Sequence, residues 1–486
     1  MKPVIIGAGP AGLSAAYELS RNGVTSVIVE ADPSRVGGLS QTATYREFRF
    51  DIGGHRFFSK NDEIEAIWTE ILGADMIDVA RSSRIFYRGR FFDYPLRPWN
   101  ALVNLGPFEA LRCLFSYAWA RLFPRRPVVS FEDWVVNQFG ERLFNIFFKT
   151  YTEKVWGIPT HEISADWAAQ RIKGLSLMQA VMNALFGGRK DGRVITTLID
   201  TFRYPRRGPG MMWERLAERL AAEGSDLRLG SPVVAVERDT DGVVAVRCNS
   251  AEGETRLEAT HVVSSMPLRE LVLAMTPAAP YAVQRAAADL KYRDFLTVVL
   301  IVEQTDLFPD NWIYIHDAHL QVGRVQNYGN WSPDMVPTAG HSCLGLEYFC
   351  FENDEMWNAD DETLIALGQR ELTRMGLVDG SRVRDGCVVR MPKAYPVYDE
   401  TYQANVDIVR AWLEENVPNL QVMGRNGMHR YNNMDHAMMT GLLAARNLLG
   451  GDWDLWKVNA DAQYLEEDSG GPQGGRAVPR RTRPAG

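Results

Sequence analysis

The feature that most constrains the fold is a glycine-rich turn near the start of the chain. The stretch PVIIGAGPAGLSAAYELSRNGVTSVIVEAD predicts a strand, a turn, a helix and a second strand, a βαβ unit of about 30 residues. Within it Gly7, Gly9 and Gly12 have the GxGxxG spacing, and Glu30 ends the second strand. The glycines permit a tight turn, close approach of the backbone to a pyrophosphate and close helix packing, while the carboxylate suits ribose hydroxyls. We therefore expect an α/β fold with a Rossmann-like dinucleotide-binding domain.

Two glycine pairs follow this unit. Gly37 and Gly38 stand in SRVGGLSQT, and Gly53 and Gly54 stand in FDIGGHRFF with His55 beside them. Glycine lets the backbone approach a flat ring closely because it has no side chain. The first pair resembles the second dinucleotide motif of the large flavoprotein group that includes amine oxidases, protoporphyrinogen oxidases and UDP-galactopyranose mutases; ordinary loop glycines are the alternative. Together the pairs favour FAD over NAD, with Gly53 and Gly54 close to the flavin ring.

Length and charge limit the classes of function. The chain has 486 residues, 46% of them hydrophobic, so we expect two or three interleaved domains. The net charge of -8 argues against binding nucleic acid and makes any anion site a local feature. The five cysteines include no CxxC pair and the histidines show no ligand spacing, so neither a disulfide framework nor a metal is expected. The N-terminus enters a strand without a signal peptide, which predicts a cytoplasmic location.

The patterns along the chain predict an FAD-binding domain in three pieces with two insertions. A helical substrate subdomain separates the first two pieces, and an antiparallel-sheet substrate domain separates the second from the third. The tail is rich in glycine, proline and arginine and is expected to be disordered. In chain order the predicted boundaries are 1–94, 95–203, 204–279, 280–415, 416–466 and 467–486.

An amphipathic helix is expected between Phe108 and Arg126. Its apolar residues recur at helical spacing around Arg112 and Arg121, but no apolar run reaches the roughly 18 residues needed to span a bilayer. We interpret the apolar face as a packing surface of the helical subdomain, because interior helices with snorkelling arginines are common. Attachment to a membrane surface is the alternative. Membrane association is therefore not expected, although the sequence leaves it open.

Several further stretches resemble UDP-galactopyranose mutases. They are FDIGGHRFF, SFEDWVVNQFG, YTEKVWGIPT, QRIKGLSL, RYPRRGPGMMW, GRVQNYGNWSP, AYPVYDE and GRNGMHRYNNMDH, and they extend over almost the whole chain except its tail. Each is loose by itself, but their order and spacing together are specific. The resemblance implies a redox-neutral reaction in which reduced flavin acts as a nucleophile toward the anomeric carbon of a nucleotide sugar, and the sugar ring recloses at the other size. FAD would then be active when reduced, with NAD(P)H as an external reductant.

The same resemblance assigns roles to individual residues. Arg171 and Arg324 match the two arginines that clamp the substrate diphosphate, a role that suits bidentate, charge-assisted hydrogen bonds. By role, the further matches are Tyr314 and Tyr395 along the phosphates, Trp156 in the substrate pocket, His55, Arg425 and Tyr431 as catalytic-site residues, and Val233, Gly424 and Met434 as cofactor contacts. For any one of these residues, a surface or core position is the alternative.

Two local motifs have more than one interpretation. In RYPRRGPG we expect backbone NH groups of the turn at Gly208 to support FAD, with Arg206 and Arg207 simply solvated as the alternative. The pair Asp435 and His436 is interpreted as a helix N-cap with a neighbour that touches the edge of FAD, rather than as an acid/base couple.

The chain also departs from the mutases. Leu96 replaces an aromatic residue of the uridine pocket, Thr152 replaces an asparagine, and Trp331 replaces a tyrosine. Neither the nucleobase nor the sugar is therefore fixed by the sequence. A flavin oxidoreductase acting on an amine, a porphyrinogen or a polyprenyl substrate is the rival interpretation, and a non-catalytic FAD protein is the third.

Overall fold

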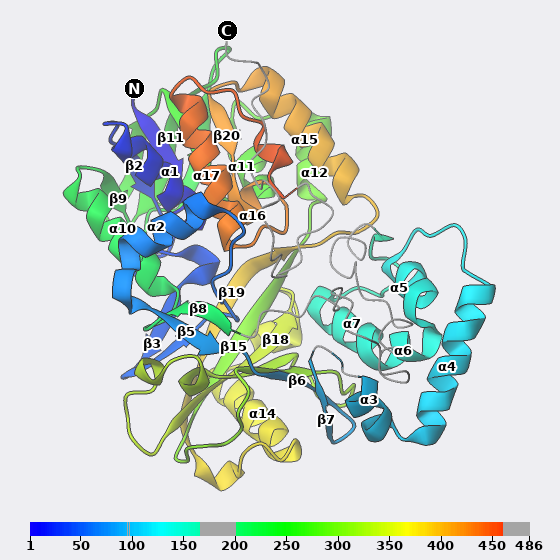
Figure 1. The fold of residues 1–486 in the computed structure, drawn as a ribbon. Coiled ribbons are helices and arrows are strands. Elements are labelled where there is room, and N and C mark those ends of the chain that lie inside the picture. Colours follow the sequence, from blue (N-terminus) through cyan, green and yellow to red (C-terminus); the bar gives the residue numbers. More distant parts are fainter. Residues whose placement is uncertain (95, 97, 166–200, 460–486) are drawn as a thin grey trace.

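The computed structural model describes residues 1–94, 96, 98–165 and 201–459. Two large sheets and one group of helices form its architecture (Figure 1). The sheet that holds the first strand of the chain lies at one end with its helices, a sheet of longer strands lies below it, and the helical group projects to one side. The glycine motifs and the residues matched to the substrate are distributed over all three parts.

The first large sheet is parallel and has five strands. In order across the sheet they are β20 (Leu420–Val422), β13 (His261–Ser264), β1 (Pro3–Ile6), β2 (Val27–Val29) and β9 (Asp226–Arg228). Helix α1 (Pro10–Arg21) has a proline in its first turn, where no backbone NH is needed. It packs against α17 (Met434–Leu448), and a Cβ at Gly441 would lie only 2.1 Å from the carbonyl oxygen of Ala11. The two helices therefore approach backbone to backbone.

Smaller elements surround this sheet. A four-stranded sheet has the order β12 (Gly253–Glu258), β11 (Val243–Ser250), β10 (Val233–Arg238) and β14 (Met275–Thr276). Two ribbons pair β3 (Thr42–Tyr45) with β4 (Phe48–Asp51), and β5 (Met76–Ala80) with β8 (Thr201–Pro205). The helices of this part are α2 (Asp62–Leu72), α10 (Gly210–Ala222), α11 (Leu268–Leu273), α12 (Tyr281–Ala288), α15 (Tyr402–Asn416) and α16 (Gly424–Gly427).

The second large sheet has seven strands and is almost entirely antiparallel. In order they are β19 (Val383–Pro396), β15 (Tyr292–Val302), β18 (Ser342–Cys350), β17 (Arg324–Asn327), β16 (Trp312–Ile315), β6 (Ser83–Tyr87) and β7 (Arg90–Asp93). Only β16 and β6 pair in parallel among the described strands of this sheet. Strands β15 and β18 are buried along their whole length, which accounts for their apolar runs. Helix α14 (Asp361–Arg374), preceded by α13 (Glu355–Asn358), packs on β15 and β19.

The hairpin of β6 and β7 lies in this second sheet, although its residues fall within the range 1–94 that the sequence assigned to the FAD-binding domain. The chain thus leaves the parallel sheet before the helical insertion begins. The other predicted boundaries stay a prediction.

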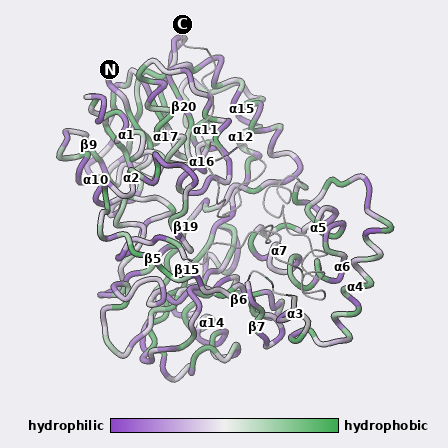
Figure 2. The backbone as a smooth tube through the Cα atoms, viewed as in Figure 1, coloured by the Kyte–Doolittle hydropathy of each residue, from purple (hydrophilic) through white to green (hydrophobic). Residues whose placement is uncertain are grey.

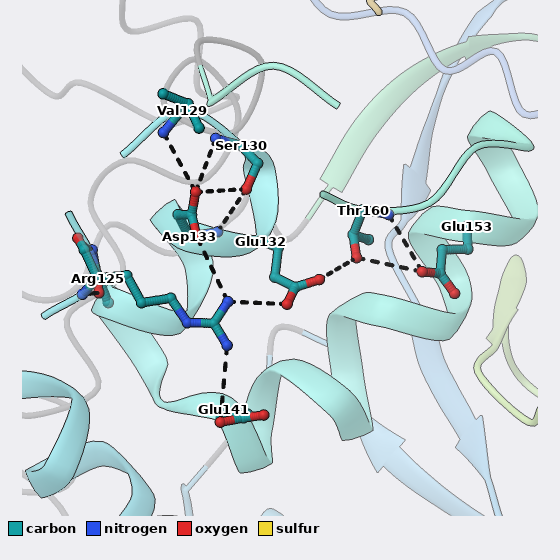
Figure 3. Close-up of polar contacts among 9 residues, drawn as sticks. Arg125, Val129, Ser130, Glu132, Asp133, Glu141, Glu153 and Thr160 are labelled. Carbon is teal, nitrogen blue, oxygen red and sulfur yellow. Dashed lines mark hydrogen bonds and ion pairs between the residues drawn. The ribbon is translucent and has the colours of Figure 1, made fainter. Parts of the chain in front are cut away.

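The helical group contains α3 (Pro98–Leu105), α4 (Pro107–Leu122), α5 (Phe131–Phe139), α6 (Glu141–Phe144) and α7 (Thr150–Trp156). Helix α5 begins at a capping box in which Ser130 and Asp133 bond each other's backbone NH groups. Arg125 lies 3.0 Å from Glu132 and 3.9 Å from Glu141, and Glu132 accepts a hydrogen bond from Thr160 (Figure 3). This network joins the loop after α4 to α5, to α6 and to the segment that follows α7.

The apolar face of α4 does not pack as expected. Only Ala110, Cys113 and Ala120 of this helix are buried, whereas Phe108 is 86% exposed. The interpretation of the segment as a packing surface is therefore wrong, because the side chains that face inward are small and the large ones face outward. Among the described residues, no helix combines the length and the apolar character that crossing a bilayer requires.

Candidate functional site

The turn after β1 requires glycine at two positions, because a side chain there would clash with neighbouring atoms. A Cβ at Gly12 would lie 1.8 Å from the carbonyl oxygen of Gly7, and one at Gly7, where φ is +97°, would lie 2.2 Å from the Ser265 hydroxyl. A Cβ at Gly9 would meet no atom closer than 3.8 Å, so this part of the turn is bare backbone. Gly9 is also the N-cap of α1 and offers no side-chain cap. The NH groups of the helix start are thus suited to an anion.

The carboxylate of Glu30 is held at the same place. It accepts hydrogen bonds from the backbone NH of Ala8 (2.7 Å) and of Asp32 (2.9 Å). Burial raises the pKa of Glu30 despite these bonds. A bare anion-binding turn beside a buried carboxylate fits the ADP half of a dinucleotide, with the pyrophosphate at the turn and a ribose at Glu30.

Gly37 and Gly38 pack against this turn. The NH of Gly37 donates to the carbonyl of Ala8 at 2.9 Å. Gly37 has φ +103°, and a Cβ there would lie 2.8 Å from the ring of Trp213. The pair therefore closes the wall of the turn, and a side chain at Gly37 would clash with α10.

The remaining predicted cofactor contacts are distributed unevenly. Gly424, with φ +75°, stands where a Cβ would be 3.1 Å from Ala11, so α16 reaches the start of α1. Met434 is the first residue of α17. Val233 begins β10 in the four-stranded sheet and packs partly buried against the core of the parallel sheet. The structure gives the positions of these three residues, whereas their contact with a cofactor stays a prediction.

Gly53, Gly54 and His55 follow β4 and lie over the second sheet. Gly53 has φ +89°, and a Cβ on Gly54 would approach the side-chain oxygen of Gln326 to 3.6 Å. Gln326 is on β17, two residues from Arg324. This loop therefore brings the glycine motifs within reach of the residues matched to the substrate.

A row of polar side chains crosses one face of the second sheet. Tyr314 pairs with Arg324 across β16 and β17, and Arg324 pairs with Glu347 across β17 and β18, so their side chains share a face. The guanidinium of Arg324 lies 2.5 Å from the carboxylate of Glu347, which is fully buried. Burial alone would lower the pKa of Arg324, but the charge of Glu347 raises it well above its ordinary value. Arg324 is therefore a fixed cation with a built-in counter-ion.

Aromatic rings from three other elements cover this row. The rings of Tyr395 and Tyr431 stack 5.7 Å apart at 12°, and Trp156 at the end of α7 lies 6.2 Å from each of them. Arg324 donates a 3.0 Å hydrogen bond to the Tyr395 hydroxyl. The guanidinium of Arg425 lies 4.5 Å from the Tyr431 ring centre. Residues far apart in the sequence thus form one arginine–tyrosine cluster, which we define as Trp156, Arg324, Tyr395, Arg425 and Tyr431.

The imidazole of His55 is neutral in this environment. Burial first, and then the charge of Arg425, lower the pKa of His55 to about 3. Its Nδ1 lies 3.2 Å from the carbonyl oxygen of Gly53, and because a carbonyl only accepts, Nδ1 carries the proton. Nε2 is then an acceptor.

Two further sequence hypotheses concern arginines. Arg171 lies outside the described residues, so its approach to Arg324 stays a prediction. Arg206 faces the carboxylates of Asp75 and Asp334, and the NH of Gly210 donates to Thr42, so the turn of RYPRRGPG is bonded to protein groups.

The N-cap of α17 lies before the Asp435–His436 pair and not within it. Asn433 caps this helix, and His436 completes the cap by accepting from the backbone NH of Asn433 at 3.4 Å. Trp331, in contrast, is only 1% exposed and stacks on Trp312, so it belongs to the core rather than to a pocket.

Two of the buried acids that sequence reasoning missed are Glu347 and Asp51. Glu347 stands alone in the strand SCLGLEYFC, and a single carboxylate in a fully buried strand signals a cationic partner. Asp51 ends β4 and accepts hydrogen bonds from Tyr204 (2.5 Å) and Thr42 (2.9 Å). Burial raises the pKa of Asp51 to about 7. Within the described ranges, no group of histidine, cysteine, aspartate and glutamate side chains is arranged to hold a metal.

Comparison with known families identifies the protein family of the chain. The sequence profile described as flavin containing amine oxidoreductase matches residues 10–449, which is most of the chain. The chain belongs to this family. FAD is its cofactor, in agreement with the turn and the Glu30 carboxylate described above.

Among curated relatives, AofH of Mycobacterium tuberculosis, named as a flavin-containing monoamine oxidase, is 27% identical over 278 residues, or 54% of this chain and 56% of that protein. A Klebsiella pneumoniae protein named as a UDP-galactopyranose mutase is 27% identical over 174 residues, or 34% of this chain and 43% of that protein. The chain thus spans about half the length of the curated relatives it matches.

Among solved structures, reduced UDP-galactopyranose mutase superposes with a TM-score of 0.79 at 23% identity, covering 92% of this chain and 95% of that chain. A structure from Exiguobacterium sp. 255-15 named as a protoporphyrinogen oxidase gives 0.67 at 18% identity, covering 92% and 98%. At such identities the likeness establishes the fold. The resemblance to UDP-galactopyranose mutases seen in the sequence is confirmed.

Proposed function

We propose that this flavoprotein is a redox-neutral mutase that interconverts the pyranose and furanose rings of a nucleoside-diphosphate sugar. The observation that carries the proposal is the row formed by Tyr314 and Arg324, with Tyr395 bonded to Arg324, beside the Gly53–Gly54 loop. Hydroxyl and guanidinium donors next to the predicted place of the flavin ring are what a diphosphate substrate needs.

Arg324 would bind a phosphate oxygen directly. Its Nε is buried and has no hydrogen-bond partner among the described residues, so one arm of the guanidinium can still donate. Glu347 fixes the other side of the group, and Gln326 donates to Glu347 at 2.6 Å. Arg425 places a second cation over Tyr395, 5.5 Å from its ring centre. Arg171 is proposed as a further cation for the same diphosphate.

The sugar would lie between the flavin ring and the stacked tyrosines. A bound reduced flavin supplies a nucleophile for the anomeric carbon, and NAD(P)H is the proposed external reductant. Trp156 and Tyr395 are buried and would exclude water from the opened sugar. His55 stays neutral and presents Nε2 as a hydrogen-bond acceptor, which fits a positioning role for a sugar hydroxyl.

The test is an anaerobic assay with the flavin reduced by dithionite. Nucleotide sugars are incubated with the protein, and the pyranose and furanose isomers, which have equal mass, are separated by chromatography. We expect interconversion with reduced protein and none with oxidised protein. A protein with Arg324→Lys should fold and bind FAD but interconvert the isomers much more slowly, while Tyr281→Phe, on the exposed surface of α12, is the matched control.

A flavin-dependent oxidoreductase is the second candidate, favoured by the family match over residues 10–449 and by the monoamine oxidase relative. Because Glu347 offsets the charge of Arg324, the site is also compatible with a substrate that is not an anion. Hydrogen peroxide release with an amine, a porphyrinogen or a polyprenyl substrate, without isomer interconversion, would replace the mutase proposal.

A further inference from the structure

The outward face of α4 exposes several large apolar side chains to solvent. Phe108 is 86% exposed, Phe115 69%, Trp119 67% and Leu122 73%. Hydrophobic residues recur along this helix at the outer edge of the molecule (Figures 1 and 2). Contiguous exposed apolar patches of this kind mark surfaces that another phase or molecule covers.

The exposed side chains form one continuous stripe. We define the α4 ridge as Phe108, Leu111, Phe115, Trp119, Leu122 and Phe123. The members on the helix are spaced by three or four residues and therefore share one face. Val129 in the following loop is also 67% exposed.

The charges beside the ridge have a single sign. From Pro107 to Val129 the exposed charged residues are Arg112, Arg121 and Arg126. The one acid of this segment, Glu109, is paired with Arg142 and Arg112. On a chain whose net charge is -8, this is a local basic border.

The acids behind the loop share one arginine. Figure 3 shows Arg125 turned inward between Glu132, Asp133 and Glu141. Arg125 therefore offsets one of their three negative charges, and over residues 107–142 the five arginines still outnumber the four acids.

We propose that the α4 ridge lies in the interface of an anionic lipid bilayer, with the helix axis parallel to the surface. Phenylalanine, leucine and tryptophan side chains would enter the boundary between headgroups and acyl chains, and the three arginines would contact lipid phosphates. With 16 residues, α4 would lie on the membrane rather than cross it. This proposal is independent of the reaction proposed above.

Other occupants fit less well. A second copy related by a two-fold axis would bring two arginine-bordered faces together, which is electrostatically unfavourable. The C-terminal residues 467–486 carry four arginines and few large apolar side chains, so they match neither the charge nor the apolar character of the ridge.

The test is sedimentation of the full chain with vesicles. Vesicles of phosphatidylcholine alone are compared with vesicles of equal parts phosphatidylcholine and phosphatidylglycerol. We expect binding to the anionic vesicles, weakening as salt rises. The double variant Phe115→Ser/Trp119→Ser should bind at least about 100-fold more weakly, and Arg121→Glu/Arg126→Glu should lose the preference for anionic lipid. Quenching by brominated lipid should fall in Trp119→Phe.

The matched control is Leu273→Ser/Tyr281→Ser, which removes two exposed apolar side chains elsewhere, 48% and 77% exposed. It should bind vesicles like the original protein. FAD content and thermal unfolding verify that each variant is folded. The proposal is overturned if the original protein stays in the supernatant with anionic vesicles, or if Phe115→Ser/Trp119→Ser only converts an oligomer to a monomer.

Discussion

The glycine turn beside β1 and the arginine–tyrosine cluster over the second sheet are held by different means. The turn depends on missing atoms, since a Cβ at Gly12 would overlap the carbonyl of Gly7 at 1.8 Å. The cluster depends on side chains from α7, β17, β19 and the α16 region that contact one another. A change in the turn should therefore abolish function at once, whereas changes in the cluster should have graded effects. The predictions below test this difference, from the largest expected effect to the smallest.

Gly12→Ala should give a protein without FAD. The new methyl group would overlap the backbone of Gly7 in the turn, which cannot move away without distorting the start of α1. The flavin absorbance of the purified protein measures the effect. The control is Gly329→Ala, because a Cβ there would meet its nearest atom at an ordinary 3.5 Å. Normal flavin content in Gly12→Ala would show that the turn tolerates a side chain.

Asp51→Asn should change how stability depends on pH. Burial raises the pKa of Asp51 in the folded protein to about 7, above its ordinary value of 3.8. The folded state therefore retains a proton that the unfolded state loses, so this contribution is complete below pH 3.8 and is lost as pH rises through about 7.

Relative to Asp51→Asn, the original protein should lose up to about 4 kcal/mol of unfolding free energy between these limits. Urea unfolding at pH 5 and at pH 8 provides the comparison. Parallel pH profiles for the two proteins would mean that Asp51 does not hold a proton.

Arg324→Lys should weaken nucleoside-diphosphate binding by about 10- to 100-fold while FAD stays bound. Lysine retains the charge next to Glu347 but loses the planar fork that reaches both Glu347 and Tyr395. Titration of UDP and UDP-sugars by calorimetry measures the change. Tyr395→Phe, which removes one hydroxyl, should weaken nucleoside-diphosphate binding less than Arg324→Lys does. Unchanged affinity in both variants would separate the cluster from the substrate.

Arg206→Ala should have the smallest effect. Arg206 is about half exposed, and its ion pairs with Asp75 and Asp334 are 3.5 and 3.7 Å long, so the loss should be below about 1 kcal/mol. Flavin content should not change. Loss of FAD from this variant, measured by absorbance, would show that the Arg206 side chain contributes to cofactor binding.

The parts predicted best from the sequence are those written in one short stretch. The strand, turn and helix around Gly7 and Gly12 follow from local backbone geometry that the residue types reveal directly. The resemblance then named Arg324, Tyr395 and Tyr431, which the structure brings together.

The rest depended on contacts between distant segments. Nothing near Asp51 in the sequence indicates Tyr204 as its partner, and Glu347 finds Arg324 only through strand pairing. The α4 ridge was misread because periodicity shows that a helix has an apolar face, not whether the protein covers it.

The order of strands in the parallel sheet has a consequence for synthesis. Strand β1 lies between β2 and β13, and the sheet is completed only by β20 at Leu420–Val422. During synthesis, the glycine turn after β1 is therefore made long before the segments that pack on it. Gly441, whose backbone lies against Ala11, is made more than 400 residues later. Because β20 and α17 lie in the last part of the described chain, the parallel sheet and its covering helix cannot be completed before nearly all of that chain has been made.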